Sequence, residues 1–98
     1  MKITKKLNDS AMEVALEGRL DTSTAPQLEE CLNASLEGIE DLSLDLSALD
    51  YISSAGLRVL LSAQKRMMKQ GKMQITGANE TVMEIFEITG FSDILTIL

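Results

Sequence analysis

Two adjacent serines, Ser53 and Ser54, are the residues of this sequence best placed for chemistry. They follow Leu42 to Leu46, where leucines alternate with polar residues in the pattern of a strand with one buried face. From Leu57 onward the apolar residues recur at helical spacing, so the serines stand at the start of a predicted helix. The unpaired backbone N–H groups at a helix start favour negative charge. A hydroxyl there can serve as a helix cap, a nucleophile or a phosphate acceptor.

Catalysis by the chain itself is not expected, because the sequence contains no histidine. That absence removes Ser-His-Asp and Cys-His catalysis, the usual general base near neutral pH, and most zinc sites. The segment Ile52–Gly56 has one of the two glycines of a nucleophile elbow, and no phosphate-binding loop is present. Cys31 is the only cysteine, and its place on an apolar stripe predicts a small buried side chain. We therefore expect no catalytic residue, cofactor or metal, and the residues alone favour a helix cap as the use of Ser54.

The composition limits the number of domains, the partners and the cellular location that can be expected. A chain of 98 residues, 45% hydrophobic and 24% charged, predicts one globular domain over residues 1–98. A net charge of −6, with no basic patch among aromatic residues, argues against direct binding to nucleic acid. The sequence has neither an apolar run long enough to cross a membrane nor the apolar stretch of a signal peptide. These features predict a cytoplasmic protein that does not act at a membrane.

Strand and helix patterns alternate along the chain after an initial hairpin. This order predicts an α/β fold, a small mixed sheet with β-α-β units. Periodicity does not decide whether residues 93–98 form a helical turn or a terminal strand. The predicted strands cover residues 2–6, 12–20, 42–46 and 72–76, and the predicted helices cover about 24–36, 54–70 and 79–88.

Two local patterns within the predicted helices give further expectations. Thr24 and Gln27 have the spacing of a capping box at the start of the first helix. Met67 and Met68 lie at the end of the apolar stripe of the second helix, which favours core packing for both.

Right-handed crossovers place the carboxyl ends of parallel strands at one edge of a sheet. We therefore expect Asp21-Thr22, Ser53-Ser54 and Thr76-Gly77 along one rim, where binding sites gather in open α/β sheets. Asp21 has no apparent buried partner and is expected to matter more for binding than for folding. Gly56 either packs helix on sheet or lets the backbone of a partner approach closely.

Four segments taken together resemble a STAS domain of the bacterial anti-anti-sigma factor family, the anti-sigma factor antagonists. The similarity covers essentially the whole chain, and its specific part is the element of serine, small residue, glycine and leucine that ends at Leu57. The resemblance implies that the helices pack mainly on one face of the sheet. The four segments are Gly18–Asp21, Leu42–Leu46, Tyr51–Leu57 and Ile85–Phe91.

The same resemblance implies a phosphorylation-controlled partner switch. In the family, a partner kinase phosphorylates the serine two positions before the glycine, which maps to Ser54; sporulation-type members often carry Asp at the position of Ser53. The unphosphorylated form would bind an anti-sigma factor that is also a serine kinase, and a PP2C-type phosphatase would reset the modified form. The implied partner-binding residues are Asp21, Thr22, Ser53, Ser54, Gly56 and Arg58.

Two other classes of function remain open at this point. The same fold could serve as an interaction module in a non-sigma signalling, secretion or transport complex. A nucleotide-binding or enzymatic domain is disfavoured by the missing phosphate loop and the missing histidine.

Overall fold

The computed structural model describes all residues from 1 to 98, folded as one four-stranded sheet with three helices. β1 pairs with β2 in antiparallel fashion, whereas β2 with β3 and β3 with β4 pair in parallel, so the predicted mixed α/β sheet is confirmed. None of the helices combines the length and the apolar character needed to cross a membrane. The sheet order is β1 (Lys2–Asn8), β2 (Ala11–Leu20), β3 (Asp41–Ile52) and β4 (Lys72–Thr76), and the helices are α1 (Ala25–Ser35), α2 (Ser54–Gln70), α3 (Glu80–Thr89) and a short 3₁₀ helix η1 (Phe91–Asp93).

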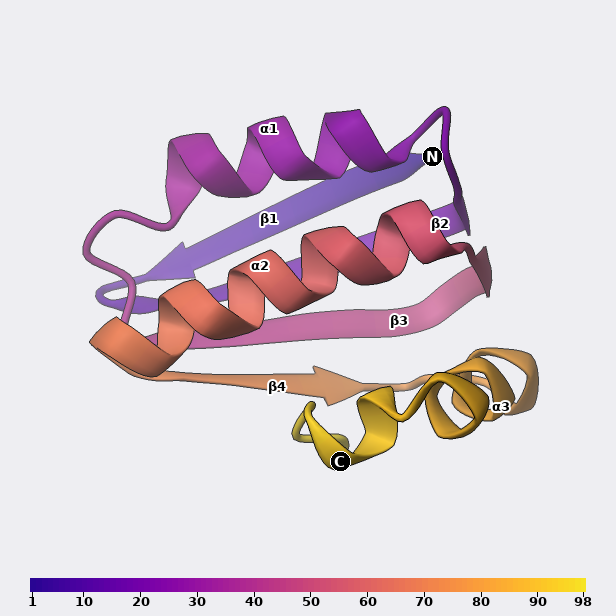
Figure 1. Ribbon diagram of the computed structural model, residues 1–98. Coiled ribbons are helices and arrows are strands. Elements are labelled where there is room, and N and C mark those ends of the chain that lie inside the picture. Colours follow the sequence, from indigo (N-terminus) through magenta and orange to yellow (C-terminus); the bar gives the residue numbers. More distant parts are fainter.

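The core lies between the sheet and the pair of helices α1 and α2, which run side by side over one sheet face (Figure 1). Alternate residues of the central strands, up to Leu46 in β3, point into this core and are buried, with Val14, Leu44 and Ile75 fully so. The residues between them point to the other face of the sheet, which stays polar. There the antiparallel register sets Lys2 opposite Glu17 and Lys6 opposite Glu13, pairs of opposite charge.

β3 is longer than the predicted strand at residues 42–46, and two irregularities explain the difference. The pairing of β3 with β2 shifts once between Ala15 and Glu17 and again between Gly18 and Arg19. At each shift β3 contributes one residue more than β2, which is the count of a β-bulge. The strict alternation of buried and partly exposed residues therefore stops after Leu46, although the strand continues.

The helix α3 packs beside the second half of β3, beyond the end of β4 (Figure 1). Asn79 caps it as predicted, because its side-chain oxygen accepts the N–H of Val82 at 2.8 Å. The amide of the same side chain donates to the carbonyl of Leu49 at 3.0 Å, which ties the helix start to β3. Phe86 fills the interface and is fully buried. The chain then ends in η1 and a single parallel bridge between Ile97 and Ile75, so the last segment combines a helical turn with strand pairing.

Three sequence expectations about side chains are wrong. Met68 is 72% exposed, because it lies beyond the edge of the buried stripe that includes Met67. Cys31 is partly exposed at the border of the α1 stripe. Thr24 and Gln27 do not form a capping box: the Thr24 hydroxyl turns back to the end of β2, and the Gln27 amide donates to the carbonyl of Met1 at 3.2 Å.

Candidate functional site

The turns that follow β2 and β3 are joined directly at one end of the sheet. The N–H of Ser53 donates to the carbonyl of Leu20 at 2.8 Å, which holds the Asp21 turn against the start of α2. Thr76 and Gly77 do not share this rim, because Thr76 pairs with Asp45 while β3 runs on to residue 52. The predicted three-part rim is therefore wrong in its third part: the bulged, elongated β3 carries the serines well past the end of β4.

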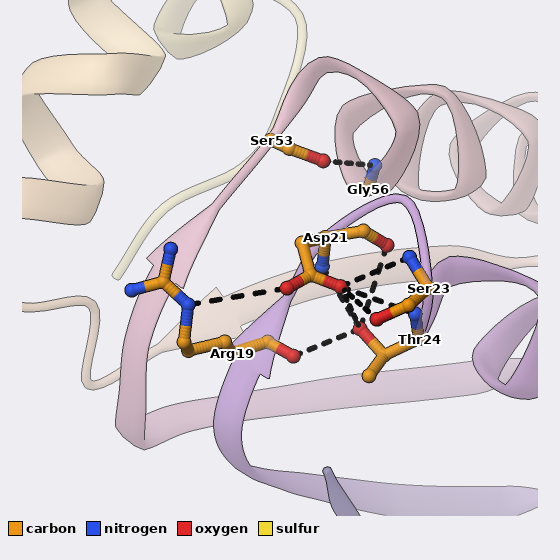
Figure 2. A network of polar contacts seen from close by, with 6 residues as sticks. All are labelled: Arg19, Asp21, Ser23, Thr24, Ser53 and Gly56. Carbon is orange, nitrogen blue, oxygen red and sulfur yellow. Dashed lines mark hydrogen bonds and ion pairs between the residues drawn. The ribbon is translucent and has the colours of Figure 1, made fainter.

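The two serines have different roles at the start of α2. Ser53 is the N-cap, with its hydroxyl accepting the N–H of Gly56 at 3.5 Å and its carbonyl accepting the N–H of Leu57 at 2.9 Å (Figure 2). Ser54 is the first residue of the helix, its side chain is exposed, and its hydroxyl makes no hydrogen bond within the chain. The interpretation of Ser54 as the helix cap is thus wrong, because Ser53 already fills that position.

Gly56 sets how closely α2 approaches the sheet. A methyl group at this buried position would lie 2.6 Å from Cγ of Leu20 and 2.9 Å from Cγ1 of Ile52. Those distances are far below van der Waals contact, so only a glycine lets the first turn of α2 rest on the ends of β2 and β3. Of the two expectations for Gly56, the structure supports close packing of helix on sheet.

Asp21 organises the turn between β2 and α1. Its Oδ1 accepts the N–H of Ser23 at 3.0 Å, the hydroxyl of Ser23 at 2.7 Å and the N–H of Thr24 at 3.2 Å (Figure 2). The Ser23 hydroxyl is the largest cause that lowers the pKa of Asp21; partial desolvation raises it, and the two backbone N–H groups lower it further. Thr24 closes the turn, accepting the N–H of Asp21 at 2.8 Å and donating to the carbonyl of Arg19 at 2.8 Å.

Arg19 and Tyr51 form a platform beside this turn that sequence reasoning did not single out. They are cross-strand partners in β2 and β3, and the guanidinium carbon lies 4.6 Å from the centre of the tyrosine ring. Nε of Arg19 lies 3.9 Å from Oδ2 of Asp21, so the same side chain also faces the turn (Figure 2). Both residues lie in segments that carry the family resemblance, but their pairing depends on the bulges in β3, which the sequence pattern does not reveal.

A shallow groove of about 200 Å³ separates the first turns of α1 and α2. Two of the expected partner-binding residues, Thr22 and Arg58, line it, and both side chains are exposed. The groove is otherwise small and apolar apart from Glu29, and its full lining is Thr22, Ala25, Pro26, Glu29, Ala55, Arg58 and Val59. The structure thus brings Asp21, Thr22, Ser53, Ser54 and Arg58 to one end of the molecule, with Gly56 buried beneath them.

This arrangement offers a free hydroxyl with no group in the chain to activate it. The carboxylate of Asp21 accepts hydrogen bonds from Ser23 and Thr24 and makes none with Ser54. No group of three or more histidine, cysteine, aspartate or glutamate side chains is arranged to hold a metal ion. Activation of the Ser54 hydroxyl as a nucleophile would therefore need a base from outside these contacts.

Comparison with known proteins gives matches along the whole chain. The family model for the STAS domain matches residues 2–98. The Bordetella bronchiseptica protein named as an anti-sigma factor antagonist, BtrV, is 39% identical over 99% of this chain and 85% of its own. The anti-sigma-B factor antagonist of Bacillus subtilis is 32% identical over 99% of this chain and 90% of its own.

Solved structures share the same fold. The anti-sigma factor antagonist SpoIIAA in its unphosphorylated form matches with a TM-score of 0.85 at 14% identity, over 99% of this chain and 88% of that one. The phosphorylated form of Bacillus SpoIIAA matches with a TM-score of 0.77 at 13% identity, over 99% of this chain and 91% of that one.

Proposed function

This chain belongs to the anti-sigma factor antagonist family of STAS domains, and from that membership we propose a partner switch that phosphorylation of Ser54 controls. In the proposed cycle the unphosphorylated chain binds an anti-sigma factor that is also a serine kinase, and the sigma factor held by that kinase is released. The kinase uses ATP to phosphorylate Ser54, which ends the complex, and a PP2C-type phosphatase restores the hydroxyl. The cycle takes place in the cytoplasm, and the chain is its substrate and ligand.

The observation that carries this proposal is that the two neighbouring serines differ in their hydrogen bonds. Ser53 supplies the oxygen that caps α2. The hydroxyl of Ser54 makes no hydrogen bond within the chain, and its side chain is exposed. A hydroxyl that the fold does not use can be modified without loss of a native hydrogen bond.

The charge of the phosphate explains why the partner responds. A phosphate adds about −1.5 to −2 charge at neutral pH. At an exposed helix N-terminus this charge is favourable by about 0.3–1 kcal/mol, so the fold itself has no reason to change. Across an interface, like charges cost several kcal/mol, which is enough to change an affinity by orders of magnitude. The phosphate would stand beside the Asp21 turn, which already carries a negative charge, in the middle of the proposed contact surface.

The similarity to SpoIIAA in both of its states supports a switch that keeps the fold. One chain matches the unphosphorylated and the phosphorylated form of that protein along nearly its whole length.

The first experiment identifies the partner. Wild-type, Ser54→Ala and Ser54→Asp proteins serve as baits in lysate of the source bacterium, with Ser62→Asp as a control for added charge on the same exposed side of α2. Wild type, Ser54→Ala and Ser62→Asp should retain a kinase of the GHKL type, and Ser54→Asp should lose it. Retention of that kinase by Ser54→Asp at the wild-type level would contradict the charge mechanism.

The second experiment identifies the acceptor, with the purified kinase, ATP and intact-mass measurement. Ser54→Ala should take up no phosphate. Ser53→Asp lacks the other hydroxyl but keeps a side-chain oxygen that can cap α2, so it should be phosphorylated like wild type. Uptake that persists in Ser54→Ala and disappears in Ser53→Asp would reverse the assignment.

A further inference from the structure

We infer that Arg58 binds the phosphate of phosphorylated Ser54 within the same chain and is thereby withdrawn from the groove between α1 and α2. The inference rests on the proposed function in one respect, since it takes Ser54 as the acceptor. It adds a second effect of the modification: besides the charge that the phosphate brings, the groove loses the cation that lines it.

The spacing of the two residues on α2 is the first support. Arg58 stands four residues after Ser54, and side chains at this spacing are neighbours on a helix surface, with about 5–6 Å between their Cβ atoms. Both side chains are exposed, so neither has to leave a packed position to meet the other. An acidic group that precedes a basic one by four residues is also the more favourable order along a helix.

The guanidinium of Arg58 is free to take this partner. The ion pairs of the structure join Arg19 to Asp21 and Lys72 to Asp41, and Arg58 belongs to neither. No hydrogen bond from its side chain fixes it elsewhere. Guanidinium and phosphate make two parallel N–H···O bonds, a geometry that a lysine cannot reproduce.

Arg19 is the other arginine at this end of the molecule, and it is already engaged. It faces the carboxylate of Asp21 at 3.9 Å and stacks on the ring of Tyr51 at 4.6 Å, as Figure 2 shows for the contact with Asp21. To reach Ser54 it would have to give up both contacts. The contacts thus favour Arg58 over Arg19 as the residue that receives the phosphate.

The groove shows why the movement of one side chain matters. Arg58 is the only basic residue in its lining, and Glu29 is the only acidic one. In the unmodified protein the groove offers a partner one cation and one anion. Once Arg58 turns to the phosphate, Glu29 is the charged side chain left in the groove, so a partner carboxylate that pairs with Arg58 loses its counter-ion.

The test needs no kinase: phosphoserine is placed at position 54 by an expanded genetic code, and the phosphate is titrated by ³¹P NMR at low salt. The chain has no histidine, so no imidazole titrates near the second pKa of the phosphate, about 6. In Arg58→Gln this pKa should be higher than in wild type by about 0.2–0.4, the size expected for an exposed pair at this spacing. Arg66→Gln, which removes the same charge three turns along α2, should leave it unchanged.

A second measurement reports on Arg58 directly. The Nε–Hε resonance of Arg58 should move between the unmodified and the modified wild-type protein, while that of Arg19 should stay with Asp21 and Tyr51. An unchanged phosphate pKa in Arg58→Gln, or a rise in Arg19→Gln in its place, would overturn the inference. A kinase that modifies another serine would overturn the proposed function and leave this measurement intact, so the two failures are distinguishable.

Discussion

The carboxylate of Asp21 accepts two backbone N–H groups and one hydroxyl, and these bonds favour its charged form. The sequence pattern provides no partner for this residue, so it predicts that Asp21 matters more for binding than for folding. The contacts add a structural role, because Asp21 fixes the turn that leads into α1. The same turn is bound to the start of α2 by the hydrogen bond from the N–H of Ser53 to the carbonyl of Leu20. We therefore expect Asp21→Ala to be less stable than Asp21→Asn, which keeps an acceptor oxygen. Both variants should lose affinity for the kinase.

The low pKa of Asp21 predicts how stability depends on pH. A pKa that is lower in the folded than in the unfolded chain stabilises the fold above the unfolded value, about 3.8. That contribution is lost as the pH falls through the folded value. Wild type should therefore exceed Asp21→Asn in stability at pH 7, and the gap should close below about pH 4.

Urea denaturation midpoints at pH 7, 4 and 2.5 test this expectation. Asp45 provides a second case, because the backbone N–H of Ser47, at 3.0 Å from its Oδ1, is the main cause that lowers its pKa. The difference in stability between wild type and Asp45→Asn should likewise disappear as the pH falls. A gap between wild type and Asp21→Asn that stays constant at all three values would contradict the linkage argument.

In Gly56→Ala, helix propensity and overpacking change the free energy of unfolding in opposite directions. Helix propensity alone would make alanine more favourable by about 1 kcal/mol. The added methyl group, however, would stand 2.6 Å from Cγ of Leu20, a branch point in a fully buried side chain that cannot simply swing away. Overpacking of this kind costs about 1–3 kcal/mol, so we expect a net loss of stability in thermal or urea denaturation. Ser62→Ala, at an exposed position of the same helix, should stay within about 0.5 kcal/mol of wild type.

At the scale of the helix, the cap of α2 predicts a contrast between two neighbouring serines. Ser53→Ala removes the oxygen that accepts the N–H of Gly56 and should cost about 0.5–2 kcal/mol. Ser54→Ala removes a hydroxyl with no partner and should change the free energy of unfolding by less than about 0.5 kcal/mol. The same denaturation experiment measures both. Equal losses in the two variants would mean that the hydroxyls share the cap.

The helices and strands followed from periodicity where each element keeps one period throughout. α2 and β4 have the predicted bounds, residues 54–70 and 72–76. β3 is the exception, since its two bulges break the alternation after Leu46 and leave no regular pattern for the stretch that delivers the serines. The misplaced rim at Thr76 and Gly77 has the same cause, because strand ends can be aligned only when the register is known.

The candidate site was predictable only in part for a similar reason. The position of Ser54 at a helix start followed from the change of period, but which serine caps the helix depends on a difference of one residue. The turn bonds of Asp21 and the stacking of Arg19 on Tyr51 depend on backbone geometry and strand register, which a sequence pattern does not contain. The role proposed for Ser54 came from family resemblance, and the geometry shows why its hydroxyl is available.

For the whole molecule, we expect phosphorylation to change affinity and leave the fold in place. The buried stripe of α2 packs on the sheet, while Ser54 points to solvent at its first turn. Hydrogen exchange of the modified and unmodified proteins should differ only near residues 20–23 and 51–58. Loss of protection through β3 and the middle of α2 would show a conformational switch and contradict the surface mechanism.

Both outer edges of the sheet carry features that discourage strand addition, and this has a consequence for an antagonist that acts by binding a partner. The bridge at Ile97 takes up the N–H and the carbonyl of Ile75, at 2.8 Å each, on the open side of β4. β1, at the other edge, carries Lys2, Lys5 and Lys6, and such charges discourage edge-to-edge pairing of copies. A competitor acts through the concentration of its free form, and self-association would deplete that form as its amount rises. If copies of the chain do not pair through these edges, the concentration of free antagonist stays proportional to the amount synthesised, and the proposed phosphorylation of Ser54 would then set how much of it is active.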